Sequence, residues 1–176
     1  VGQKPHIVLL NKVDLADPKA TKEWTEFFTK KGITVLAIDS KSGKGNKKLI
    51  STVERLSKPI IDRWVAKGIR SRSVRTIILG IPNVGKSTLI NSLAGSAATR
   101  TANKAGHTRG QQWVKIGKNL ELLDTLGVLW PKLEDQRAAA RLAMTGAVSD
   151  DVYDLEHVMK QLLNHLLTNT PNILVE

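Results

Sequence analysis

Short runs of apolar and β-branched residues alternate along the chain with longer stretches in which apolar residues recur every three or four positions. Three of the short runs, at residues 6–10, 33–38 and 74–80, are each followed by a loop and then by a longer stretch. Two more flank a turn at residues 117–119. These patterns predict five strands and several amphipathic helices. Their alternation indicates an α/β fold in which helices flank a mostly parallel sheet.

The longer stretches also contain signals for helix ends. One helix is expected from about Lys19 to Lys31, with Gly32 at its C-cap. The next contains Pro59, where we expect a kink or a break. After residue 133 the pattern is helical, and a polar cluster interrupts it near residues 144–151. We therefore expect one domain over residues 1–146 and the start of a second, helical domain over residues 147–176.

The composition narrows the class of protein. A chain of 176 residues that is 41% hydrophobic can bury a sizeable core, so disorder is not expected. The absence of cysteine excludes disulfides, thiolate metal sites and cysteine nucleophiles. The apolar runs are too short to span a bilayer, and no signal peptide opens the chain. We expect a soluble cytoplasmic protein with no membrane partner, and a monomer. The four tryptophans are expected to pack in the core or beside mobile loops rather than to stack on bases.

The chain is strongly basic. It has 27 Lys and Arg residues against 16 Asp and Glu residues, a formal net charge of +11. A field of this sign attracts polyanions such as RNA or an anionic membrane. The alternative is that some cations hold a bound nucleotide and the rest keep the surface solvated. A nucleotide site accounts for only a few of them, so an RNA partner is favoured. Basic residues cluster at 67–75 and at 41–48.

A phosphate-binding loop is the most specific motif. Residues Gly80–Ser87 match GxxxxGK[ST], directly after one predicted strand and before a predicted helix. Backbone amides of such a loop surround phosphates, Lys86 neutralises the β- and γ-phosphates, and the Ser87 hydroxyl ligates Mg2+. The candidate nucleotide-binding residues of this segment are Asn83, Val84, Gly85, Lys86, Ser87 and Thr88.

A second motif predicts that the nucleotide carries guanine. Asn11, Lys12 and Asp14 form NKxD after the first predicted strand. A carboxylate at Asp14 can accept hydrogen bonds from N1 and the 2-amino group of guanine, whereas adenine offers neither donor. An unpaired buried carboxylate is costly, so discrimination against ATP could reach about 10^4. Ser40 and Lys41 follow the second predicted strand and can close over the edge of the base.

A third motif, DxxG, lies where the hairpin ends. Asp124 is suited to hold Mg2+ through water, while the Gly127 amide meets the γ-phosphate. Thr108, in the polar loop upstream, is the candidate threonine for Mg2+ and the γ-phosphate, although Thr99 and Thr101 compete with it. Lys86, Thr108 and Gly127 are the candidate catalytic residues; Ser87, Thr108 and Asp124 are the candidate metal ligands.

The guanine motif precedes the phosphate loop, the reverse of the usual order. Every one of these loops follows a strand, and the carboxyl ends of parallel strands meet at one edge of a sheet. The site requires the loops to converge in space and does not require one order along the chain. The order therefore predicts a circular permutation of a P-loop GTPase fold.

The order of motifs, with the runs "GIPNVGKSTLIN" and "QQWVKIGKNLELLDTLGVLWP", resembles the circularly permuted GTPases of the ribosome biogenesis GTPase A (YlqF) family. The resemblance covers nearly the whole chain. It implies a GTP- and GDP-binding switch that hydrolyses GTP with Mg2+ and binds the large ribosomal subunit, its rRNA and its proteins, late in assembly. It also implies six strands, so we expect the sixth in a segment upstream of residue 1.

The hydrolytic step is the least defined by sequence. Many GTPases place a glutamine after DxxG to orient the attacking water, and here Val128 stands there, so unassisted hydrolysis should be slow. Assistance could come from the upstream segment, from the ribosome, or from K+ bound through Asn83, which matches the potassium-binding asparagine of related GTPases. Asn83 could instead only support the loop. Two other functions stay open: a GTP-regulated RNA- or protein-binding module with incidental turnover, and a GTPase in another RNA process such as tRNA modification.

Overall fold

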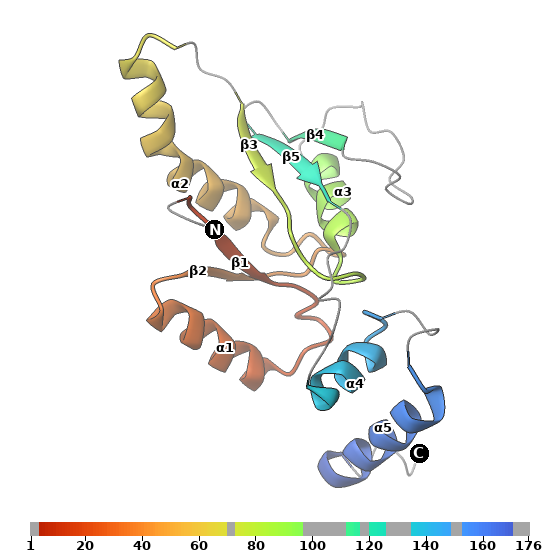
Figure 1. The fold of residues 1–176 in the computed structure, drawn as a ribbon. Helices are drawn as coiled ribbons and strands as arrows, with labels where there is room; N and C mark the ends of the chain where they lie inside the picture. Colours follow the sequence, from red (N-terminus) through yellow and green to blue (C-terminus); the bar gives the residue numbers. More distant parts are fainter. Residues whose placement is uncertain are drawn as a thin grey trace. The chain divides into compact units, whose positions relative to one another are not determined.

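The computed structural model describes residues 4–69, 73–96, 112–116, 120–125, 135–148 and 153–170 (Figure 1). The chain divides into two compact units. The first consists of Val1–Leu79 and Gly85–Leu126, and the second of Gly80–Val84 and Gly127–Glu176. Strands and helices alternate through the first unit, as the sequence predicts.

The first sheet of this unit is a β-α-β arrangement. Strand β1 (Ile7–Leu10) pairs in parallel with β2 (Thr34–Ala37), with Leu9 opposite Leu36. Helix α1 (Pro18–Lys30) connects them and packs against β2. It begins where the Asp17 carboxylate accepts hydrogen bonds from the amides of Lys19 and Ala20, at 3.0 and 3.3 Å.

The end of α1 confirms the prediction for Gly32. This residue has φ of 72°, a conformation that glycine adopts without a steric penalty. Its amide donates to the Thr29 carbonyl at 2.9 Å, and the Ile33 amide donates to the Phe28 carbonyl at 3.0 Å. These two bonds form a Schellman motif, which terminates the helix and directs the chain into β2.

Helix α1 contradicts the expectation for one tryptophan. Trp24 is 53% exposed, and no residue of α1 is buried. The helix covers only a two-stranded sheet, so its aromatic side chains pack largely on one another. The Trp24 ring lies 5.4 Å from that of Phe27 and 5.9 Å from that of Phe28. The expectation that this tryptophan packs in the core is therefore wrong.

The second sheet has the order β3-β5-β4. Strand β3 (Val74–Ile77) pairs in parallel with β5 (Leu120–Asp124), and β5 pairs antiparallel with β4 (Gln112–Ile116). The predicted hairpin is therefore confirmed, and its turn lies outside the described residues. Helix α3 (Lys86–Ser96) packs against both hairpin strands. All five predicted strands are present, divided between two sheets rather than joined in one.

Helix α2 (Asn46–Ala66) follows β2 and continues through Pro59. Of the two alternatives expected at this position, the break is therefore wrong, and the kink stays a prediction. Proline removes one amide donor from the helix interior, while burial of Leu49, Thr52 and Ser57 holds the preceding two turns against the protein. The Pro59 carbonyl also accepts a hydrogen bond from Nε of Arg63 at 3.1 Å.

One hydrophobic core serves both sheets. Helices α2 and α3 contribute to it, as do residues from each sheet, so both sheets share one core. No ladder of hydrogen bonds joins β1 to β3 in the described part of the chain. The buried members of this core are Leu36, Ile38, Leu49, Leu89, Ile90, Leu93, Ile116, Leu120 and Leu122.

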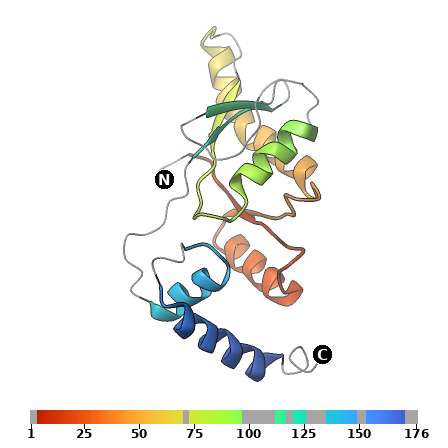
Figure 2. The same ribbon diagram turned by 90° about the vertical axis from the view of Figure 1, so that its right-hand side faces the viewer.

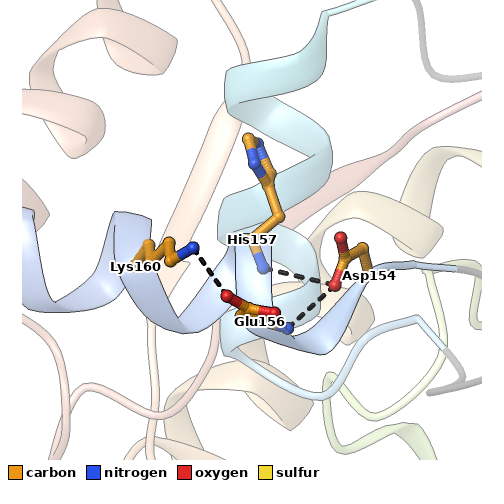
Figure 3. Close-up of polar contacts among 4 residues, drawn as sticks. All are labelled: Asp154, Glu156, His157 and Lys160. Carbon is orange, nitrogen blue, oxygen red and sulfur yellow. Dashed lines mark hydrogen bonds and ion pairs between the residues drawn. The ribbon is translucent and has the colours of Figure 1, made fainter.

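In the described part of the second unit, helices α4 (Gln136–Met144) and α5 (Leu155–Asn169) pack against each other (Figure 2). Each begins at an aspartate. The Asp154 carboxylate accepts hydrogen bonds from the amides of Glu156 and His157, and Glu156 pairs with Lys160 one turn further on, at 2.6 Å (Figure 3). Asp135 caps α4 in the same way. The predicted end of one helix near residue 144 is confirmed.

Candidate nucleotide-binding site

The phosphate-loop residues have the context that the motif requires. Strand β3 precedes the loop, and α3 begins at Lys86. Lys86 and Ser87 are half-buried, and Thr88 is exposed one residue later in the same first turn. The first turn of a helix that follows a phosphate loop is the place where such proteins bind an anion.

The backbone of the loop depends on Gly85. Its φ is 96°, and a Cβ atom at this position would lie 2.5 Å from Nδ2 of Asn11. Only glycine permits both the conformation and this close approach. Asn83 also has a positive φ, 57°, whereas Val84 between them is half-buried. The structure therefore brings the end of the phosphate loop directly against the first residue of the guanine motif.

Asn11 also joins the two loops that the sequence assigns to the base. Its Oδ1 accepts hydrogen bonds from the Ser40 amide at 3.1 Å and from the Ser40 hydroxyl at 2.8 Å. Ser40 is only 2% exposed, so these bonds are shielded from water. The predicted convergence of the loops that follow β1, β2 and β3 is confirmed for Asn11, Ser40 and Gly85.

The rest of the guanine motif is open to solvent. Lys12 has φ of 60°, an unfavourable conformation for a residue with a side chain, and local strain of this kind is common at binding sites. Its carbonyl accepts a hydrogen bond from the Leu15 amide at 3.0 Å, which forms a tight turn. Asp14, inside this turn, is exposed. A base seated over the turn would bury the carboxylate that is to recognise it.

The loop of residues 39–45 is shaped by Asp39, which sequence reasoning missed. Its Oδ1 accepts hydrogen bonds from the amides of Lys41 and Ser42 at 2.9 and 3.3 Å. The pKa of Asp39 is lowered, chiefly by a hydrogen bond from the Ser42 side chain and also by these amides, against the opposing effect of burial. Aspartate followed by Ser and Gly residues is typical of such a turn, so the sequence could have indicated the role of Asp39. Lys41 is exposed beside it.

Asn83 makes a contact inside the second unit. Its Nδ2 donates a hydrogen bond to the carbonyl of Gly146, just after α4. The side-chain amide is therefore engaged in supporting the chain. Its role toward K+ stays a prediction.

Several candidate residues lie outside the described residues or are described in part. Thr108, Gly127 and Val128 belong to the first group. Asp124 is the last residue of β5, and only its backbone is described. Within the described ranges, no three acidic, histidine or cysteine side chains gather into a metal site. No helix among those described has the length and apolar character needed to cross a bilayer.

Comparison with known proteins shows the family to which the chain belongs. Residues 75–176 match the model of the family described as 50S ribosome-binding GTPases. Ribosome biogenesis GTPase A of Bacillus pumilus is 49% identical over 168 residues, which cover 96% of this chain and 60% of the relative. The protein of the same name from Thermotoga maritima is 38% identical over 147 residues, covering 84% and 50%.

Solved structures give the same result. GNP-bound YlqF from T. maritima superimposes with a TM-score of 0.63 at 30% identity, covering 92% of this chain and 58% of that one. A GDP-bound YlqF structure matches equally well, with coverage of 92% and 59%. The chain thus spans about 60% of the length of the first curated relatives that it matches.

Proposed function

The chain belongs to the family of 50S ribosome-binding GTPases, and from this we propose that the protein binds and hydrolyses GTP as a switch in late assembly of the large ribosomal subunit. It has a P-loop GTPase fold in circularly permuted order, with the guanine motif ahead of the phosphate loop. The proposal includes rRNA and ribosomal proteins as partners, and a monomer acting in the cytoplasm.

The observation that carries this proposal is the position of Asn11. It accepts two hydrogen bonds from Ser40, and its amide lies against Gly85 of the phosphate loop. Residues from the loops after three different strands therefore meet around one side chain. A guanine nucleotide requires this arrangement because its base and its phosphates must be held at the same time.

The described loop residues support a nucleotide at this place, and the metal ligands are part of the proposal. The backbone at Gly85 packs directly against Asn11 with no space for a side chain, and the first turn of α3 follows immediately, as in loops that bind phosphates. In the proposal, Asp14 accepts hydrogen bonds from guanine and Lys86 neutralises the phosphates. Ser87, Thr108 and Asp124 hold Mg2+, which neutralises charge on the phosphates, and the Gly127 amide contacts the γ-phosphate.

Hydrolysis in this proposal is slow until a partner assists it. Val128 stands where many GTPases carry a glutamine that orients the attacking water, and its side chain can neither donate nor accept a hydrogen bond. Three sources of assistance are compatible with this: an upstream segment of the protein, the ribosome, and K+ near Asn83. The rival hypothesis is a binding module in which GTP sets affinity for RNA and turnover is incidental; Val128 favours it.

One experiment separates these hypotheses. GTP turnover of the full-length protein is measured alone, with purified large subunits and with small subunits, each in K+ and in Na+ buffer. Stimulation by large subunits only supports the assembly switch. Negligible GTP turnover in every reaction, by protein that still binds GTP, contradicts the hypothesis of a GTP-hydrolysing switch and supports the hypothesis of a binding module. Higher turnover in K+ without ribosomes supports the potassium hypothesis.

We also propose that the domain over residues 1–146 contains a further strand from outside these 176 residues. One edge of β1 and one edge of β3 are unpaired in the described part of the chain, yet a single core underlies both sheets. Ile77, the last residue of β3, is 54% exposed, and Leu79, two residues further on, is 67% exposed. A parallel strand between β1 and β3 would pair both edges and reduce this exposure. Addition of the preceding natural sequence should raise the melting temperature and protect the amides of both strands from hydrogen exchange.

In this proposal, residues 147–176 begin a helical domain that takes part in subunit binding. The pairing of α4 with α5 and the cap at Asp154 support an ordered helical start. A protein truncated after residue 146 should keep nucleotide affinity and lose affinity for the large subunit. Equal subunit affinity of the truncated and full-length proteins would contradict this part of the proposal.

A further inference from the structure

A partly buried side-chain hydrogen bond connects α2 with α3. Asn46, the first residue of α2, is 4% exposed, and its Nδ2 donates to the Ser92 hydroxyl on α3 at 2.8 Å. Oδ1 of the same amide is also buried, and it has no hydrogen-bond partner within the described residues. Neither residue belongs to the motifs identified in the sequence.

This bond lies between the two halves of the candidate site. Asn46 directly follows the 39–45 loop, which carries Ser40 and Lys41, and Ser92 lies on the helix that begins with Lys86. The loop also passes over the bond. A Cβ atom at Gly43 would lie 3.4 Å from Nδ2 of Asn46 and 3.5 Å from the Ser92 hydroxyl. The position of the loop is thereby tied to α3.

The connection matters because strand pairing does not provide it. The 39–45 loop follows β2 in one sheet, and the phosphate loop follows β3 in the other, with no ladder between the sheets in the described residues. A nucleotide touches both loops, so their spacing must match the spacing between base and phosphates. A spacing that is set before binding avoids the entropic cost of setting it during binding.

The energetics of the pair indicate placement rather than stability. A buried polar atom without a partner is unfavourable, and replacing both members of a hydrogen-bonded pair by apolar groups of similar shape is often neutral or stabilising. The Asn46 side chain, with its unpaired amide oxygen, is therefore expected to contribute little to the stability of the contact between α2 and α3. Its bond to Ser92 is directional, and direction is what positioning requires.

From these observations we infer that Asn46 and Ser92 are a positioning pair, which holds the 39–45 loop at the distance from α3 that a guanine nucleotide needs. The inference rests on the proposed guanine-nucleotide function and adds two residues that touch neither base nor phosphate. It predicts that nucleotide affinity and thermal stability respond differently when the pair is removed.

The test uses the double variant Asn46→Leu/Ser92→Ala in the full-length protein. We expect an unchanged or raised melting temperature and a dissociation constant for GDP that rises about three- to tenfold, the range expected for loss of one hydrogen bond. Inorganic pyrophosphate, which probes the phosphate loop alone, should bind as it does to the wild type. The single variant Ser92→Thr keeps both the hydroxyl and Asn46. It should bind GDP with an affinity within about twofold of the wild type.

Thr52→Val supplies the matched control. Thr52 is buried on α2, and its hydroxyl donates to the Lys48 carbonyl of the same helix at 2.7 Å. This variant removes a buried hydroxyl without a connection to α3, so GDP affinity should not change. Wild-type GDP affinity in the double variant overturns the inference. If the double variant has a lowered melting temperature and binds neither GDP nor pyrophosphate, the inference is also overturned, because the pair would then have a purely structural role. Wild-type protein that binds neither ligand refutes the proposed function and this inference together.

Discussion

Three glycine substitutions separate backbone strain from contact with Asn11. Gly95 lies in α3 with nothing within 4 Å of a Cβ atom, Gly32 has φ of 72° with equally open space, and Gly85 has φ of 96° with Asn11 Nδ2 at 2.5 Å. Alanine at Gly95 should stabilise the protein by up to about 1 kcal/mol, because alanine favours helix. Alanine at Gly32 should cost about 1–2 kcal/mol of strain.

Alanine at Gly85 carries both penalties. In addition to the strain, the methyl group displaces the Asn11 amide, which accepts two hydrogen bonds from Ser40. Each bond contributes about 1 kcal/mol, so strain and both bonds together should cost about 3–4 kcal/mol. Displacement of Asn11 also separates the loops around the nucleotide, so GDP affinity should fall by at least about tenfold. The other two variants should bind GDP as the wild type does.

The free energy of unfolding of each variant is measured by chemical denaturation without nucleotide. GDP affinity is then measured by competition with a fluorescent analogue. The result that refutes the reasoning is a Gly85→Ala protein that is no less stable than Gly32→Ala and binds GDP normally. In that case the contact between the phosphate loop and Asn11 would not exist in the folded protein.

Three further predictions concern single features. The pKa of Asp39 is lowered from its ordinary value of 3.8, so its carboxylate stabilises the folded state above that pH and the contribution is lost as the pH falls through the lower folded value. Asp39→Asn should therefore flatten the decline of the melting temperature below about pH 4. Asp154→Ala should destabilise the second unit by about 1 kcal/mol through loss of the cap on α5, with less helical circular dichroism on heating. Reversing the charges of the basic cluster at residues 67–75 should weaken binding to large subunits. The slope of log affinity against log salt should fall by about 0.7–0.9 for each phosphate that the protein no longer neutralises. Unchanged binding across salt would exclude rRNA contact by Lys67, Arg70, Arg72 and Arg75.

Local signals explain the parts of the fold that sequence predicted well. The alternation of apolar residues located all five strands, and the glycine after Lys31 located the end of α1 because only a left-handed residue completes that motif. Convergence of Asn11, Ser40 and Gly85 followed from a topological rule, since loops after parallel strands meet at one edge. Each of these features is determined either by a few adjacent residues or by the parallel direction of the strands, and both can be inferred from sequence.

The remainder depends on contacts between distant segments. The bond between Asn46 and Ser92 joins residues that are 46 positions apart, and no local pattern marks either of them. Continuity of α2 through Pro59 depends on packing that outweighs the missing donor. Trp24 was misassigned because its exposure depends on what covers α1, and hydrophobicity alone does not reveal that.

The permuted order of elements has a consequence for synthesis. Strands β1 and β2, with the residues proposed to select guanine, are translated before the phosphate loop, which reaches Ser87 only after α2 is complete. A ligand stabilises a chain only once its binding residues exist, so GTP cannot assist the amino-terminal half as it emerges. That half must reach its β-α-β arrangement through its own contacts. Nucleotide can contribute as a folding aid only when α3 has left the exit tunnel.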